Sequence, residues 1–212
     1  VRLPAPFAKE ATQARPLLVQ WIPQPAVASG GHSSALQVQW GSVLHAQYEL
    51  AAQGGQTAIL KGRVHIADQD SAEAATALQH EMAYPPVAKI QLRQLDLDAW
   101  RQVWSAQGAS QARGDSQSLN GMNEWIPAQT AMQVKQLNVT GRLFDQVDLT
   151  LERKAMGWDV RGQAQQFKGQ AQWRPSLAGK PDKLTAQLAM LYLPRSEAAA
   201  TAGAQGDMPD AM

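Results

Sequence analysis

The 212-residue chain contains no cysteine. This absence excludes disulfides, thiol nucleophiles and every zinc or iron–sulfur site that depends on cysteine. Charge is also scarce, because Lys and Arg number 19, Asp and Glu number 18, and charged residues make up only 17% of the chain. A formal net charge of +1 provides no basic surface for a phosphate backbone, so we expect no nucleic-acid partner.

Long apolar runs are missing too. No segment approaches the roughly 18 to 20 consecutive apolar residues of a membrane-spanning helix, and the stretch 16–28 is interrupted by Gln20, Pro23, Gln24 and Pro25. The chain starts at Val1 and lacks the pattern of a signal peptide, which is a basic start followed by an apolar core and a cleavage site with small residues. We therefore expect an internal or C-terminal segment of a longer polypeptide, in which any membrane contact is made by parts outside this segment.

Glutamine and alanine take the place of charge. About one residue in eight is Gln, and hydrophobic residues still account for 44% of the chain. The Gln residues are spread through patterned segments and form no tract, which argues against a disordered polymer.

The dominant pattern is an alternation of apolar and polar residues, which is typical of β-strands with one buried face. In the first half it runs through 36–40, crosses a Gly41-Ser42 turn, and continues through 44–50 and 60–66. In the second half it runs through 147–152, 158–161 and 167–174, and the short connection 154–157 ends in Gly157. We predict a meander of antiparallel strands with one apolar face.

A weak internal repeat supports this prediction. Residues 90–97, 132–139 and 186–193 share the form apolar-Gln-apolar-x-x-apolar-x-apolar. The x-x step shifts the alternation by one residue, which a strand accommodates by a bulge or a twist. The repeat indicates an architecture extended by similar strand units; the alternative is a chance match among Leu-rich strands.

One helix is predicted around 98–107. Asp98 occupies an N-cap position, Gly108 provides the stop, and Trp100, Val103 and Trp104 share a face that would pack onto the sheet. Linkers are expected at three segments rich in Pro, Gly, Ser and Ala, which are 23–34, 109–123 and 194–212.

No residue pattern indicates catalysis or metal binding. The four histidines, at positions 32, 45, 65 and 80, lack metal-ligand spacing. The Gly114-Asp115-Ser116 sequence, which some esterases use, lies in a polar linker without a preceding strand, and the Asp96 and Asp98 pair fits a strand end and a helix cap. We therefore expect no enzyme activity, no metal and no cofactor.

The apolar face itself needs a partner. Strands of eight to ten residues reach about 26 to 33 Å, and one helix cannot cover so wide a sheet. Trp40, Trp158 and Trp173 lie in register with aliphatic residues, which favours a core or groove over an exposed sugar-stacking platform. Either the sheet closes into a sandwich or barrel, or it forms a trough for an apolar ligand.

Several stretches resemble the YhdP family of AsmA-like (TamB-related) proteins, which are anchored in the inner membrane of Gram-negative bacteria. They are residues 3–9 (LPAPFAK), 36–41 (LQVQWG), 95–100 (LDLDAW) and the run from 136–142 (QLNVTGR) through 157–160 (GWDV) to 169–173 (GQAQW). Their order along the chain is similar to that of the family. The resemblance implies a periplasmic β-taco, a repeating β-groove along which phospholipids pass towards the outer membrane.

The resulting hypothesis is a mainly β fold, a long antiparallel meander curved into an open groove, with one short helix around 98–107. The expected parts are 1–108 (first β-groove unit, ending in the helix), 109–130 (linker), 131–193 (second β-meander unit) and 194–212 (disordered tail). The expected partners are phospholipid acyl chains and adjoining β-groove segments of the same longer chain.

Thirteen apolar residues are predicted to line the lipid groove: Val38, Trp40, Tyr48, Leu60, Val64, Ile66, Leu92, Val134, Leu149, Trp158, Val160, Phe167 and Leu188. The competing hypothesis is a closed β-sandwich or jelly roll that binds carbohydrate or a protein through its loops, with Trp21 and Trp125 exposed there.

Overall fold

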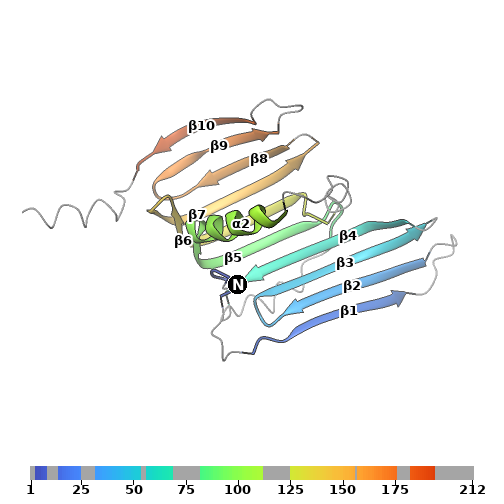
Figure 1. The fold of residues 1–212 in the computed structure, drawn as a ribbon. Helices are drawn as coiled ribbons and strands as arrows, with labels where there is room; N and C mark the ends of the chain where they lie inside the picture. Colours follow the sequence, from blue (N-terminus) through green and yellow to red (C-terminus); the bar gives the residue numbers. More distant parts are fainter. Residues whose placement is uncertain are drawn as a thin grey trace, which may run out of the picture.

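A computed structural model describes residues 3–8, 14–24, 32–53, 56–68, 82–111, 125–155, 157–175 and 182–193. These residues form one ten-stranded sheet in which the strands follow one another in chain order, with one helix in front of β5 and β6 (Figure 1). The elements are β1 (Leu17–Gln24), β2 (His32–Trp40), β3 (Leu44–Gln53), β4 (Gln56–Ala67), β5 (Val87–Asp96), α2 (Leu97–Gln111), β6 (Gln129–Val139), β7 (Arg142–Lys154), β8 (Gly157–Gln163), β9 (Phe167–Arg174) and β10 (Lys183–Leu191).

The sheet is open, because β1 and β10 lie at opposite ends of the strand order. This confirms the prediction of a mainly β, unclosed fold. The sandwich alternative is wrong for the described residues, which form a single layer of strands. Trp21 lies within β1, and Trp125 packs its ring against Tyr48 with 5.2 Å between the ring centroids.

The predicted antiparallel meander holds for β1 to β4 and for β6 to β10, and it needs one correction at β5. This strand pairs in parallel with both β4 and β6. Short hairpins impose antiparallel pairing, whereas parallel neighbours require a long crossover. The connections 68–86 and 97–128 provide that length, and the second of them contains α2.

Strand β1 corrects the predicted linker at 23–34. Pro23 and Gln24 belong to β1, whereas His32, Ser33 and Ser34 belong to β2. The sequence LLVQWIPQ of β1 does not alternate in polarity, so the pattern gave no strand there. A proline is compatible with an edge strand, because its missing amide hydrogen can fall on the unpaired side.

The slip predicted in the repeat appears as a register shift in one of the three copies. In β10 the register shifts between Leu188 and Met190, as expected for a bulge. Between β5 and β6 the register is the same before and after the predicted slip, although Leu92 and Leu95 both contribute to the same apolar cluster.

Helix α2 begins earlier and ends later than predicted. Asp96 is the N-cap, because its Oδ1 accepts a hydrogen bond from the backbone N–H of Ala99 at 2.9 Å. Asp98 instead accepts hydrogen bonds from the backbone N–H groups of Thr140 and Gly141, at 3.0 and 2.8 Å. Gly108 lies inside the helix, since a single glycine weakens a helix by about 1 kcal/mol without ending it.

The division of the chain into two β units stays a prediction. Strand β5 pairs directly with β6, so the sheet is continuous between the two proposed units. Most of the proposed linker and the whole proposed tail, at 112–124 and 194–212, lie outside the described residues.

Candidate functional site: two faces of one sheet

The strand register arranges apolar residues in rows that cross the whole sheet. Residues paired across neighbouring strands point to the same face. One such row, the central row, contains only small or aliphatic side chains: Val19, Val38, Ala46, Val64, Ala88, Thr130, Leu151, Val160, Ala171 and Ala186. The face that carries this row is called the apolar face here, and the opposite face the polar face.

Larger side chains flank the central row. On one side the first flanking row contains Leu17, Trp40, Leu44, Ile66, Ile90, Met132, Leu149, Gly162, Gly169 and Leu188. On the other side the second flanking row contains Trp21, Leu36, Tyr48 and Gly62 on β1 to β4, and Arg153, Trp158, Trp173 and Leu184 on β7 to β10. The side chains on either side of the central row are therefore larger on most strands, with Gly62, Gly162 and Gly169 as exceptions.

Helix α2 and the N-terminal segment 3–8 cover one margin of this face. Phe7 stacks on Trp40 with 5.3 Å between ring centroids, and its edge meets Trp100 of α2 at 5.9 Å. The indole N–H of Trp100 donates a hydrogen bond to the backbone oxygen of Ala5 at 2.9 Å. The Arg15 guanidinium lies over the Trp40 ring at 5.4 Å, a cation–π contact.

Trp125 covers part of the opposite margin. The Tyr48 hydroxyl donates a hydrogen bond to the Trp125 backbone oxygen at 3.0 Å, and burial raises the pKa of this hydroxyl. The Tyr48 ring also lies on Gly62, where an added Cβ would come within 2.5 Å of it. Glycine at position 62 therefore makes room for the aromatic ring.

Between these covers the central row stays accessible. Val38, Val64 and Val160 are all half-buried. By contrast, Val134 and Val147, which lie beyond the first flanking row, are each only 2% exposed and form the main core cluster. A second buried cluster, formed by Tyr48, Leu50 and Ile59, packs against Ala46 and Val64 of the central row. The buried core thus occupies two parts of the apolar face, and the central row is half-buried at Val38, Val64 and Val160.

Twelve of the thirteen predicted groove residues lie on the apolar face. Val38, Val64 and Val160 are in the central row, and the others belong to the flanking rows or the core cluster: Trp40, Tyr48, Ile66, Leu92, Val134, Leu149, Trp158, Phe167 and Leu188.

Leu60 is the exception. A register shift at Glu49 and Leu50 pairs Leu50 with Ile59, so Ile59 enters the core at 7% exposure while Leu60 is 44% exposed. The prediction also left out small members of the central row such as Ala46, Ala88 and Ala171. These alanines are part of the same alternation of apolar and polar residues, but the prediction selected mainly large side chains.

The polar face carries side-chain hydrogen bonds between strands. Gln91 donates to Gln133 at 3.3 Å, Gln170 donates to Gln187 at 2.8 Å, and His65 Nε2 lies 3.3 Å from Gln91 Oε1. Three hollows in the described part of the molecule lie on this face, over β1 to β5, over β4 to β8 and over β7 to β10.

The other sequence candidates acquire structural roles or fall outside the description. Asp96 accepts a hydrogen bond from the Asn138 amide at 3.2 Å in addition to capping α2. Ser116, Asp115 and His80 lie outside the described residues. Within the part that the structure describes, no three His, Asp or Glu side chains form a cluster suited to a metal ion.

Fold and faces together define a class: open β-sheet proteins with one apolar and one polar face. Residues 1–211 match a protein family described as YhdP protein. The chain therefore belongs to the YhdP family of AsmA-like envelope proteins. Comparisons with curated proteins and with solved structures gave no match. In the described residues, no helix combines the length and the hydropathy needed to cross a bilayer.

Proposed function

We propose that the apolar face binds phospholipid acyl chains and supports their transport towards the outer membrane. The segment would act within the periplasmic portion of an inner-membrane-anchored protein and help to maintain the envelope. The observation that carries the proposal is the central row, because its small and aliphatic side chains span all ten strands on one face of the sheet.

The dimensions suit this ligand. Ten strands spaced about 4.8 Å apart place β1 and β10 about 43 Å from each other along the central row. One leaflet of a bilayer contributes about 15 Å of hydrocarbon, so an extended acyl chain fits within the row. Each methylene group that leaves water contributes about 0.8 kcal/mol, which suffices for binding without any covalent step. The proposed role is therefore non-enzymatic.

The two edges of the sheet support a further part of the proposal, that adjoining β-groove segments of the same longer chain continue the sheet. All residues of β1 and β10 are exposed, among them Trp21 at 55% and Leu184 at 69%. Strand β1 has no charged residue, and β10 has only Lys183 at its start. Free edges without charge are ready to pair with further strands.

Site-specific photocrosslinking tests lipid binding. A photoreactive residue is placed at Leu149 or Val160, on the apolar face, in cells that contain labelled phospholipid. Matched controls carry it at Thr150 or Arg161, the next residues along the same strands, which point to the polar face. We expect lipid adducts at Leu149 and Val160 only; equal labelling at all four positions would contradict the proposal.

A further inference from the structure

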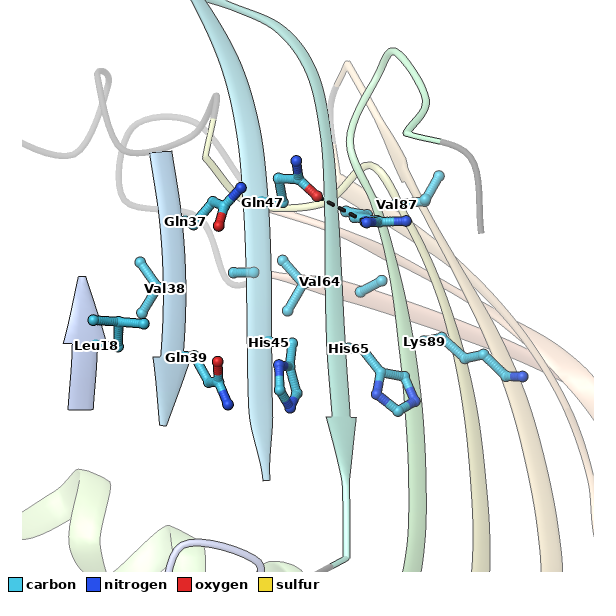
Figure 2. A pocket seen from close by; sticks show the side chains of 13 residues that line it. Leu18, Gln37, Val38, Gln39, His45, Gln47, Val64, His65, Val87 and Lys89 are labelled. Carbon is cyan, nitrogen blue, oxygen red and sulfur yellow. Dashed lines mark hydrogen bonds between the residues drawn. The ribbon is translucent and has the colours of Figure 1, made fainter. Parts of the chain in front are cut away.

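A hollow on the polar face brings amides and two cations together beside apolar residues such as Leu18 and Val87. It lies over β1 to β5 and has a volume of about 390 Å³ (Figure 2). The side chains around it include the amides of Gln37, Gln39 and Gln47 and the cations Arg63 and Lys89. It lies on the opposite side of the sheet from the proposed acyl-chain row.

Strand register explains how the hollow forms. One wall is a row that contains Gln37, Gln47 and Arg63, and the other contains Gln39, His45, His65 and Lys89. Side chains two residues apart on a strand are separated by about 6.6 Å. The backbone at the central-row positions therefore lies at the bottom of the space between the two walls. Figure 2 shows the polar side chains around this space.

Among the described residues that line the hollow, there are cations and no carboxylate. Arg63 and Lys89 contribute two cations, and His45 and His65 contribute two imidazoles. The acids nearby on the polar face engage other cations, because Glu49 lies 3.9 Å from Lys61 and Asp68 lies 3.3 Å from Arg93. The described lining of the hollow therefore carries more positive than negative charge, in a chain whose formal charge is only +1.

Hydrogen bonds hold parts of the walls in place. Arg63 Nη2 donates to Gln47 Oε1 at 2.8 Å, which fixes the guanidinium between β3 and β4. His65 is only 6% exposed, and its ring contacts Gln91 of β5. Gln91 in turn donates a hydrogen bond to Gln133 of β6. A planar guanidinium held in this way suits a phosphate oxygen, and primary amides suit hydroxyl groups.

We propose that this hollow binds a phosphorylated sugar or polyol, with its phosphate between Arg63 and Lys89 and its hydroxyls on Gln37, Gln39 and Gln47. The phosphate monoester of a free metabolite and the phosphate of a lipid headgroup share this chemistry. The side chains that would hold the ligand point to the opposite face of the sheet from the proposed acyl-chain row, although Val38, Ala46, Val64 and Ala88 of that row also line the hollow.

Titration calorimetry on the full chain tests the site with glycerol 3-phosphate and with inorganic phosphate. We expect glycerol 3-phosphate to bind more tightly. Arg63→Gln and Lys89→Gln should each weaken its binding about tenfold, as for the loss of one charged hydrogen bond. The matched control is Lys168→Gln, a cation on the polar face of β9 outside this hollow, which should leave binding unchanged.

Vesicles that contain phosphatidylglycerol distinguish the two sources of the phosphate. If Lys89→Gln weakens binding to vesicles and to glycerol 3-phosphate alike, the ligand is a lipid headgroup; if only the soluble ligand is affected, it is a free phosphorylated polyol. Absence of glycerol 3-phosphate binding at about 10 mM would overturn the proposal. The proposal would also be overturned if Lys168→Gln weakened glycerol 3-phosphate binding as much as Arg63→Gln and Lys89→Gln do. The same holds if the chain bound inorganic phosphate as tightly as glycerol 3-phosphate. Lys89→Gln keeps the test valid if Arg63→Gln impairs folding.

Discussion

At the scale of single residues, the Asp-x-Asp sequence shows how identical side chains take different tasks. Asp96 ends β5 and caps α2, whereas Asp98, two residues later, holds the β6–β7 turn by accepting two backbone hydrogen bonds. These bonds, from Gly141 first and Thr140 second, lower the pKa of Asp98. Because hydrogen bonds favour the ionised carboxylate, this residue links the stability of the fold to pH.

Asp98→Asn should remove that link. The folded-state pKa of Asp98 is below the ordinary value of 3.8 for an aspartate, so its stabilisation is complete above that pH and is lost as pH falls through the folded pKa. We expect the variant to be less stable than the wild type at pH 7 and the difference to shrink under acid conditions. Urea denaturation across the acid range measures it.

The matched control is Arg101→Gln. Arg101 lies 3.8 Å from Asp98, and both side chains are partly exposed, so the ion pair should contribute little. If this variant reproduced the pH profile of Asp98→Asn, the ion pair and not the two backbone hydrogen bonds would be responsible.

At the scale of elements, α2 depends on tertiary contacts more than on its own sequence. Its polar and apolar residues are only weakly segregated, and Gly108 lies within it. Its N-terminus is fixed by Asp96 and Asp98. Trp100 joins it to the segment 3–8, in which Phe7 stacks on Trp40. The helix and the N-terminal segment therefore cover one margin of the apolar face as one unit.

Trp100→Ala should release this unit. The variant loses the edge contact with Phe7 and the hydrogen bond to Ala5, and we expect the free energy of unfolding to fall by about 1 to 3 kcal/mol. Denaturation measures the loss, and trypsin should cleave faster after Arg101 in α2. Gln102→Ala, at an exposed position on the same helix, is the control; a similar loss there would contradict the role given to Trp100.

At the scale of the whole molecule, stability should decline from the sheet centre to its edges. The least exposed side chains of the main core cluster, Val134 and Val147, lie on β6 and β7, whereas β1 and β10 are exposed throughout. Each edge strand has a neighbour on one side only. An open sheet of this kind loses its outer strands more easily than its centre.

Amide hydrogen exchange tests this gradient. We expect the slowest exchange in β6 and β7 and the fastest in β1 and β10, where amides that point away from the sheet lack a strand partner. Within β10, amides that face β9 serve as an internal control and should exchange more slowly. Uniform protection of both sets, increasing with protein concentration, would mean that copies of the chain pair through this edge.

Sequence patterns predicted the faces of the sheet better than its connections. Alternation at 36–50 and 147–173 placed Val38, Tyr48 and Val160 correctly because side-chain direction is a local property of a strand. The bulge that exchanges Leu60 for Ile59 and the parallel pairing of β5 depend on neighbouring strands, which local pattern does not encode. The hollow at Arg63 was missed for the same reason, since its residues come from separate strands and read individually as a solvated face.

The parallel position of β5 also determines how the chain assembles. Contacts within the β1–β4 and β6–β10 meanders connect segments close in sequence, whereas β5 reaches its partners across long intervals, from Arg63 to Val87 and from Val87 to Gln129. Closing long loops costs entropy before any contact compensates for it. The two meanders should therefore form early and separately, and the docking of β5 is the late step that joins them into one continuous surface.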